Sequence, residues 1–294
     1  MNIMKLKKTV SLLLAGLMVG SMALAGCSSS DSKSESAGSS TTKSENMSES
    51  VAADASADDL LTQIKDRGEI VIAMEGTWAP WTYHNEADEL VGYDVEVAQT
   101  LAEKLGVSVK FVEGEWDGLL AGLDDKRYDI MVNGVGITLD REKKYDFSTP
   151  YAYNRTAVIV RGDYDEIQSM EDLKGKKTAN TISSTYATLA ESYGAEVTGV
   201  DDLNQTIELL LSGRIDATLN TEVTYYDYLK AHPDADIKVA ALSDEVEQVA
   251  IPVRKGAENA SLLAAINDAL AEMNADGTLT ALSEKYFNTD ISHQ

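Results

Sequence analysis

The chain has one cysteine and three histidines among its 294 residues. A lone cysteine excludes an internal disulfide, a redox pair of thiols and a cysteine-rich zinc cluster. His84, His232 and His293 stand at spacings that no metal-binding motif uses, so ordinary surface positions explain them better. The sequence therefore predicts no metal site and no cofactor.

Basic residues are also scarce, because 25 Lys and Arg stand against 49 Asp and Glu, for a formal net charge of -24. Nucleic acids and anionic lipid surfaces repel so acidic a protein. We therefore expect no nucleic acid partner and no polyanionic ligand. A local basic residue such as Arg141 can still bind a single carboxylate.

The N-terminal apolar run is too short for a membrane span. It covers residues 10–24, less than the roughly 20 residues that a transmembrane helix needs, and it follows Lys5, Lys7 and Lys8. This pattern predicts a signal peptide. The run ends in Leu-Ala-Gly-Cys at Cys27, which resembles the lipobox of bacterial lipoproteins. The resemblance implies cleavage before Cys27, acylation of its thiol and anchoring outside the cytoplasmic membrane; the alternative is an ordinary secretory signal with an incidental cysteine.

Residues 28–57 consist almost entirely of Ser, Ala, Thr, Lys, Glu and Asp, without apolar periodicity. Such a segment cannot bury enough apolar surface to fold, so it is expected to be a flexible tether. The chain thus divides into a signal peptide over residues 1–26, the lipidated cysteine and linker over residues 27–59, and a folded body from residue 60 onward.

Two stretches of the body repeat one pattern. The first runs from Leu101 to Asn133, an interval of 32 residues, and the second from Leu189 to Asn220, an interval of 31 residues; both open on Leu-Ala-Glu. Apolar periodicity predicts the order helix, strand, helix, strand in each. Strands that alternate with helices predict parallel sheets with crossover connections, so the fold class is α/β with two similar lobes, each a mostly parallel sheet flanked by helices.

The expected elements follow from the same periodicity, with Asp94 as the N-cap of the first helix. The predicted helices cover residues 95–105, 116–123, 186–193 and 203–211, followed by two more between residue 253 and Phe287, and the predicted strands cover residues 70–74, 107–112, 129–133, 157–161, 196–200, 216–220 and 249–254.

The last two helices need a sheet to pack against, and the economical arrangement returns the chain to the first lobe. Lobe 1 is then expected to hold residues 60–157 and 252–294, and lobe 2 residues 158–251, with two extended segments crossing between them as a hinge. Ligands of parallel α/β sheets bind beyond the carboxyl ends of the strands. In this arrangement those ends face each other across a cleft.

Several motifs together resemble the family of extracytoplasmic solute-binding proteins that serve polar amino acid ABC importers. They are Gly-Tyr-Asp-Val-Glu-Val-Ala at residues 92–98, residues 134–141, Lys-Tyr-Asp-Phe-Ser-Thr-Pro-Tyr at 144–151, Asp-Leu-Lys-Gly-Lys at 172–176, and Asp-Gly-Thr-Leu at 276–279. The resemblance covers nearly the whole body. It implies a two-lobed periplasmic-binding-protein-like fold and a monomer that captures a free amino acid outside the cytoplasm and delivers it to an ABC transporter permease.

The resemblance also implies a carboxylate clamp at Arg141, whose planar fork fits a carboxylate bidentately. The backbone amides of Gly134 or Gly136, and of Thr185 at a helix N-terminus, are expected to help it. The alternative for Arg141 is a solvated arginine beside Asp140 and Glu142.

Aromatic residues are expected to form the other half of the cleft. Trp78 matches the aromatic that lies over the aliphatic part of the ligand, and Trp116 matches a second wall residue, although either could serve core packing instead. Trp81 is assigned to packing. Glu75 stands where family members often place an acid that reaches the ligand, or it could simply be hydrated.

The sequence departs from the family pattern at two places. Many members carry an aspartate for the ligand's ammonium where this chain has Thr221 and then Glu222. The partner of the ammonium could therefore be Glu222, Glu75 or neutral oxygens such as that of Thr221. At Gly136 the family usually has Ser or Thr, and the missing side chain is expected to leave room for a bulkier ligand or for water.

Asn133, Ser183, Ser184 and Tyr186 add neutral polar groups, with helix capping as the alternative for the serines. Such a pocket favours a neutral polar or sulfur-containing amino acid, and residues 144–151 with Tyr186 most resemble cystine binders. Two other functions are considered, a same-fold enzyme such as a cyclohexadienyl or arogenate-type dehydratase, and a ligand sensor for a membrane receptor. With no histidine in the cleft segments and no cysteine outside the anchor, the sequence predicts no enzyme.

Overall fold

The computed structural model describes residues 59–294, which all fall within one compact unit. The predicted signal peptide, Cys27 and the linker up to residue 58 lie outside the described residues. Within residues 59–294, no helix combines the length and the apolar character that crossing a bilayer requires.

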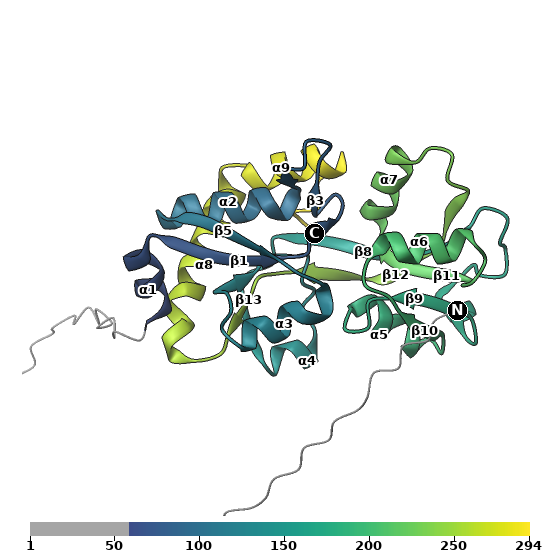
Figure 1. The fold of residues 1–294 in the computed structure, drawn as a ribbon, viewed down its shortest axis with the longest axis horizontal. Helices are drawn as coiled ribbons and strands as arrows, with labels where there is room; N and C mark the ends of the chain where they lie inside the picture. The colour runs from purple at the N-terminus through teal and green to yellow at the C-terminus, as the bar shows by residue number, and fades with distance from the viewer. Residues whose placement is uncertain (1–58) are drawn as a thin grey trace, which may run out of the picture. The chain divides into compact units, whose positions relative to one another are not determined.

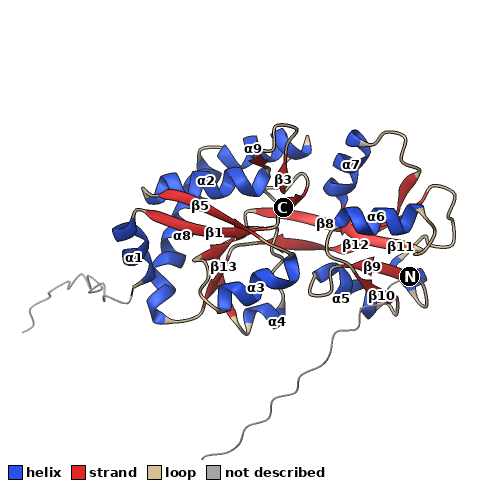
Figure 2. Cartoon of the chain, viewed as in Figure 1, coloured by secondary structure: helices blue, strands red, loops and turns tan. Residues whose placement is uncertain are grey.

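Lobe 1 denotes the elements around a three-stranded parallel sheet of order β5–β1–β6 (Figures 1 and 2). Its strands are β1 (Glu69–Met74), β5 (Ser108–Glu113) and β6 (Ile130–Met131), and its helices are α1 (Leu60–Arg67), α2 (Tyr93–Leu105), α3 (Trp116–Asp124), α4 (Leu139–Glu142), α8 (Ala260–Ala275) and α9 (Thr278–Phe287). Ile72 in the central strand pairs with Phe111 and with Ile130. Two small sheets complete the lobe: β2 (Thr77–Trp78), β3 (Thr82–His84) and β4 (Leu90–Val91), and β7 (Tyr145–Phe147) with β13 (Pro252–Arg254).

Lobe 2 denotes the elements around a five-stranded sheet of order β10–β9–β11–β8–β12. Its elements are β8 (Ala152–Arg161), β9 (Lys177–Asn180), α5 (Thr185–Ser192), β10 (Glu196–Gly199), α6 (Leu203–Leu211), β11 (Ala217–Thr221), α7 (Glu222–Ala231) and β12 (Ile237–Val249). The pairs β10/β9 and β11/β9 are parallel, whereas β8 pairs antiparallel with β11 and with β12. Only the first three strands therefore match the parallel sheet expected from the sequence, and the sheet as a whole is mixed.

The long strands β8 and β12 run between the two lobes (Figure 1). They pair from Arg161 opposite Ile237 in lobe 2 to Ala152 opposite Val249, next to lobe 1. Gly136 of lobe 1 forms an antiparallel bridge with Val249. The expected hinge segments thus correspond to parts of β8 and to the end of β12, while the boundaries at residues 157 and 251 stay predictions.

The prediction that Asp94 caps the first helix is wrong. Helix α2 begins at Tyr93 after Gly92, which has φ 136° and makes no side-chain cap, and a Cβ at Gly92 would overlap the backbone of Trp81. Asp94 is instead fully buried, and it accepts hydrogen bonds from the Gly134 amide (2.6 Å) and the Tyr151 hydroxyl (2.8 Å). Because the chain comes so close to Trp81, the helix starts two residues earlier than expected and turns this carboxylate inward.

Several other elements differ from expectation. The sequence did not predict helices α1, α4 and α7, the strands β2 to β4, β7 and β9, or most of β12. The expected strand over residues 249–254 is divided between β12 and β13. The remaining expected helices and strands are present within a few residues of their predicted ends, apart from β8, which begins at Ala152. Ile72, Leu101 and Ile266 are fully buried in one apolar cluster, and α8 packs against α1 and α2.

Candidate functional site

A cavity of about 520 Å³ lies between the carboxyl ends of the strands of the two lobes. Lobe 1 lines it with Glu75, Trp78, Trp116, Gly134 and Arg141, and lobe 2 lines it with Asn180, Thr181, Ser184, Thr185, Tyr186, Asp202, Leu203, Thr206 and Asn220. Eight of the twelve residues expected at the site line this cavity, and Asn133, Gly136, Thr221 and Glu222 do not.

Arg141 stands in the short helix α4, whose N-cap Thr138 accepts from the Arg141 amide at 3.2 Å. Its side chain is buried, with 9% exposed, so it is not the solvated arginine that the sequence left open. The guanidinium donates to the carbonyl oxygens of Gly136 (2.9 Å) and, across the cleft, of Ser183 (3.1 Å). Burial lowers the pKa of Arg141, which is the direction expected for a cation taken out of water.

Trp116 packs beneath this cation, with its ring centroid 5.2 Å from the guanidinium carbon of Arg141. The indole is 7% exposed, and among the described residues its Nε1–H finds no acceptor. A buried donor without a partner costs about 1 to 3 kcal/mol. Arg141 and Trp116 both line the cavity, so they bring to its wall a guanidinium and an indole N–H that has no partner among the described residues.

Trp78 forms the opposite wall of lobe 1. Its ring lies against Gly134, where φ is 55° and a Cβ would overlap the ring, and it stacks on Trp81 with centroids 5.2 Å apart. The Gly134 amide already donates to Asp94 at 2.6 Å, so in this conformation it is not free for a ligand. Trp81 is fully buried, as expected for a packing residue.

Both tryptophans also donate across the cleft. The Trp78 Nε1–H bonds Asn220 Oδ1 and the Trp81 Nε1–H bonds Thr224 Oγ1, each at 3.2 Å. At the other side, Asp117 of lobe 1 accepts from the amide (3.0 Å) and the hydroxyl (2.6 Å) of Ser183. These contacts join the lobes, so the structure shows a closed cleft.

Glu75 follows β1 and reaches the cavity in a fixed position. Its carboxylate accepts from Asn133 Nδ2, and its amide donates to Asn133 Oδ1, both at 2.7 Å. Asn133 is fully buried behind it and thus positions Glu75 rather than lining the site. The pKa of Glu75 is raised to about 7 in total. Burial is the main cause, the Asn133 bond opposes it, and the nearby acids Asp202 and Asp117 add smaller contributions.

In lobe 2 the N-terminus of α5 borders the cavity. Ser184 is its N-cap, since its hydroxyl accepts from the Ala187 amide at 3.1 Å and donates to the Thr181 carbonyl at 2.6 Å. Thr185 and Tyr186 follow in the first turn and line the wall. Ser184 therefore caps α5, which was the alternative that the sequence left open, and it also lines the cavity.

Neither Thr221, the last residue of β11, nor Glu222 directly after it lines the cavity. Thr221 is the N-cap of α7, with its hydroxyl 2.7 Å from that of Thr224 and accepting from the Thr224 amide at 3.2 Å. Glu222 accepts instead from the hydroxyl of Tyr226, four residues along the same helix, at 3.1 Å. Because α7 begins at Glu222, the cap holds Thr221 and the helix carries Glu222 outward.

The expectation that Gly136 leaves room for ligand or water is wrong. The space that a Cβ would occupy there holds the carboxylate of Glu247 from β12. Burial raises the pKa of Glu247, and attraction to Arg141 opposes the shift. Sequence reasoning missed Glu247 because only the register of the long hinge strand brings it to lobe 1.

Asn180, Asp202 and Asn220 were also missed as lining residues. Asn220 had a usable signal, because it ends the second repeat where Asn133 ends the first. Asn180 stands at the carboxyl end of β9, and Asp202 is the N-cap of α6, accepting from the Gln205 amide at 3.0 Å. A capping residue is common at any helix start, so nothing in the sequence separated Asp202 from other caps.

The model of bacterial extracellular solute-binding proteins, family 3, matches residues 70–289. The chain belongs to this family. It is 40% identical over 240 residues to the L-cystine-binding protein TcyA of Bacillus subtilis, and the matched residues cover 81% of this chain and 88% of that protein. The family places the folded body outside the cytoplasm and makes it a solute-binding component.

Two solved structures with this fold match the chain to different degrees, and the difference concerns the closure of the cleft. The L-cystine solute receptor of Neisseria gonorrhoeae in the unliganded open conformation is 39% identical, with TM-score 0.55 over 80% of this chain and 99% of that one. An ancestral arginine-binding protein bound to glutamine is 36% identical, with TM-score 0.71 over 75% of this chain and 98% of that one. The open structure fits less well despite its higher identity, as expected when the cleft of this family 3 protein is closed.

Proposed function

We propose that this protein captures an amino acid of the L-cystine type between its lobes and delivers it to an ABC transporter permease. The observation that carries the proposal is the buried guanidinium of Arg141, which lines the cavity between the lobes and whose two hydrogen bonds go to uncharged carbonyl oxygens. A ligand carboxylate would add charge-assisted hydrogen bonds to the attraction that Glu247 already exerts on Arg141. The likeness to cystine-binding relatives supports the choice of ligand.

The mode of attachment belongs to the same proposal. A lipid on Cys27 would hold the mature protein at the membrane, and the linker up to residue 59 would let the body reach the permease.

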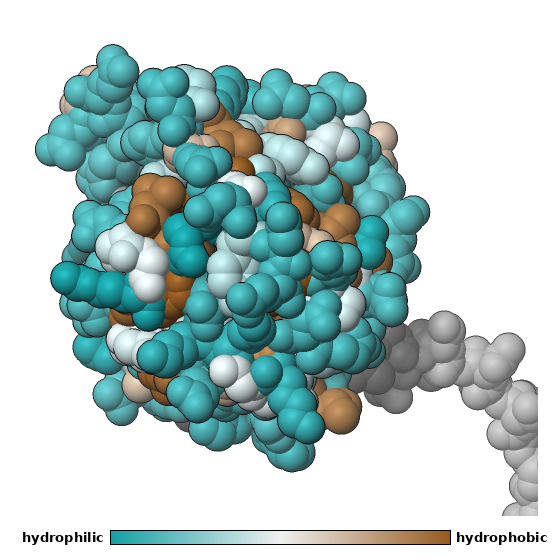
Figure 3. Space-filling view, turned by 90° about the vertical axis from the view of Figure 1, so that its right-hand side faces the viewer, coloured by the Kyte–Doolittle hydropathy of each residue, from teal (hydrophilic) through white to brown (hydrophobic). Residues whose placement is uncertain are grey.

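We also propose that the protein is a monomer. The end face of lobe 2 is mainly hydrophilic and shows apolar side chains only as separate patches (Figure 3), which supports a surface that stays in water.

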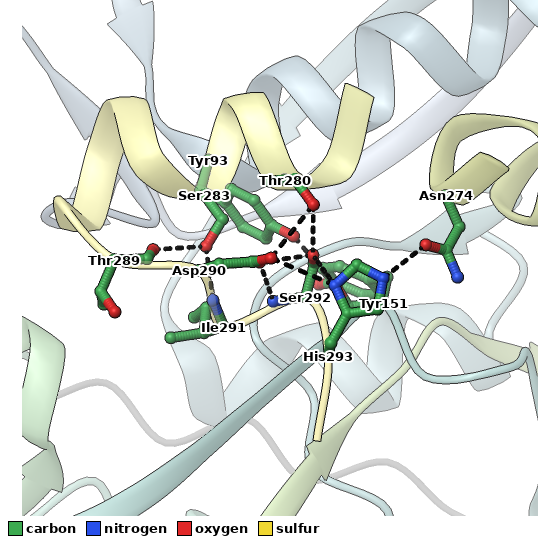
Figure 4. A network of polar contacts seen from close by, with 10 residues as sticks. All are labelled: Tyr93, Tyr151, Asn274, Thr280, Ser283, Thr289, Asp290, Ile291, Ser292 and His293. Carbon is green, nitrogen blue, oxygen red and sulfur yellow. Dashed lines mark hydrogen bonds and ion pairs between the residues drawn. The ribbon is translucent and has the colours of Figure 1, made fainter. Parts of the chain in front are cut away.

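We propose further that the protein is not an enzyme. The described residues do bring a serine, a histidine and an aspartate together near the C-terminus (Figure 4). There Ser292 Oγ (2.9 Å) and Asp290 Oδ2 (3.1 Å) both face Nδ1 of His293, while Nε2 faces Asn274 Oδ1 at 2.7 Å. A catalytic relay needs the serine and the acid on opposite ring nitrogens, so this cluster fits a structural role.

One observation favours the dehydratase alternative, namely that the pKa of Glu75 is raised to about 7, as a general acid requires. Incubation with arogenate or prephenate tests it. We expect no dehydration product, and steady turnover that is lost in Glu75→Gln would establish the enzyme instead.

A thermal-shift screen of the purified protein against the common amino acids and L-cystine tests the binding function. A ligand at 100 times its dissociation constant adds about 2.7 kcal/mol of stability. For a body of this size, that corresponds to a rise of roughly 5 to 10 °C in Tm. We expect L-cystine to give the largest rise, and no rise with any amino acid would overturn the proposed function.

A further inference from the structure

The side-chain amide of Asn180 points to a polar contact that the protein itself does not make. Asn180 is 3% exposed and lines the cavity from the end of β9. Its Nδ2 donates to the Leu219 carbonyl at 2.7 Å, which fixes the orientation of the amide. Among the described residues, nothing donates to Asn180 Oδ1. Burying an acceptor without a hydrogen bond is unfavourable, so a donor on the ligand would stabilise it.

Two carboxylates line the same cavity from opposite lobes, Glu75 after β1 and Asp202 at the start of α6. Their mutual repulsion is one reason why the pKa of Glu75 is raised. The cation of the cavity does not compensate them, because the groups that interact most with Arg141 are Glu247, Tyr186 and Tyr145. The cavity thus carries two carboxylates, Glu75 and Asp202, for the single guanidinium of Arg141, which Glu247 also attracts.

We propose that Asn180, Asp202 and Glu75 form an ammonium subsite that the two lobes complete together when the cleft closes. Asn180 Oδ1 accepts one N–H of the ligand's ammonium group, and the two carboxylates neutralise its charge. The inference rests on the proposed function, since it places an amino acid with its carboxylate at Arg141. It replaces Thr221 and Glu222, which lie outside the cavity lining, as partners of the ammonium.

Calorimetric titration of L-cystine into the wild type, Asp202→Asn and Asn180→Leu tests the subsite. Asn180→Leu removes a hydrogen bond to a charged group, and Asp202→Asn removes one of the two neutralising charges, so we expect the affinity to fall about 10- to 100-fold in each variant. Asparagine caps helices as well as aspartate does. Asp202→Asn should therefore leave the stability of the ligand-free protein unchanged, or raise it by relieving the repulsion from Glu75. The matched control is Asp201→Asn, at an exposed neighbouring position, which should bind as the wild type does.

A second probe removes the ammonium from the ligand. 3,3′-Dithiodipropionate keeps the disulfide and both carboxylates of cystine but lacks both ammonium groups, so it should bind the wild type at least tenfold more weakly. Equal affinities for the two probes would overturn the subsite, as would wild-type affinity in Asp202→Asn. If the wild type bound no amino acid at all, the proposed binding function would be wrong. This result differs from the ones that contradict only the ammonium subsite.

Discussion

The two lobes contain the same three-stranded parallel unit and use it for different tasks. The order β5–β1–β6 in lobe 1 corresponds to β10–β9–β11 in lobe 2, and Asn133 and Asn220 stand at matching places near the end of the third strand. Asn133 binds the backbone and the carboxylate of Glu75 within lobe 1. Asn220 accepts from the Thr221 amide at 2.8 Å and also from Trp78 across the cleft.

The side chains at the cavity differ more than the backbone does. Lobe 1 contributes the guanidinium of Arg141 and two tryptophans, whereas lobe 2 contributes mainly hydroxyl and amide groups with the single acid Asp202. A repeated backbone thus sets where side chains converge, and the loops after the strands decide what they recognise. We infer that lobe 1 holds the ligand and that lobe 2 completes the site on closure.

The largest expected effect comes from the lobe 1 cation. Arg141→Ala should weaken L-cystine binding by about 2 to 5 kcal/mol, because a buried carboxylate would lose its charged partner. Arg127→Ala is the matched control, since Arg127 is an exposed arginine of the same lobe. Calorimetry on both variants checks this, and equal affinities would show that lobe 1 does not hold the carboxylate.

Substitutions of Asn133 and Asn220 should give the next largest effects, one on stability and one on ligand binding. Asn133→Ala leaves the Glu75 amide and carboxylate without partners, so the free energy of unfolding should fall by about 2 to 3 kcal/mol. Asn220→Ala removes a bond between the lobes and should weaken L-cystine binding by about 1 kcal/mol. Urea unfolding of the free protein and calorimetry measure the two quantities. A larger loss of unfolding free energy in Asn220→Ala would contradict the division of tasks.

The raised pKa of Glu75 predicts a pH dependence. The folded protein holds this proton up to a pH of about 7, whereas the unfolded chain releases it near 4.5, so the contribution of Glu75 to stability falls as pH rises through that window. An ammonium beside Glu75 favours the charged form. L-cystine affinity should therefore rise about fivefold to tenfold from pH 6 to pH 7.5. In Glu75→Gln this rise should vanish; its persistence there would assign the dependence to another group.

The smallest expected effect concerns the exposed contact between Asp117 and Ser183, neither of which lines the cavity. Asp117→Ala should weaken L-cystine binding by about 0.5 to 1.5 kcal/mol, mainly through faster dissociation, because the closed cleft loses two hydrogen bonds. Asp125→Ala at the end of the same helix is the control. Stopped-flow dissociation rates that match the wild type would show that this contact does not hold the lobes together.

The sequence predicts the parts of this molecule that depend on local pattern. Apolar periodicity and the matching intervals from Leu101 and Leu189 lead to the two repeats, and the family resemblance leads to Arg141, Trp78 and Trp116 at the cavity. These features depend on neighbours in sequence or on a recognisable motif.

What the sequence could not predict depends on contacts between distant segments. Asp94 has the pattern of an N-cap, and only the packing of Gly92 against Trp81 turns it inward. Glu247 reaches Gly136 through the register of β12, and Asp202 meets Glu75 only when the lobes close. Each of these placements joins segments more than a hundred residues apart or requires the tertiary packing of a loop.

We infer that Arg141 recognises a carboxylate of the ligand, while Glu75, Asp202 and Asn180 recognise its ammonium. Calorimetric titration of the wild type with L-cystine and with cystamine, which keeps the disulfide and both ammonium groups but lacks the carboxylates, tests this inference. We expect one binding site for L-cystine and an affinity for cystamine at least a hundredfold lower, the scale of a lost buried charge pair. Cystamine binding as tightly as L-cystine would contradict it.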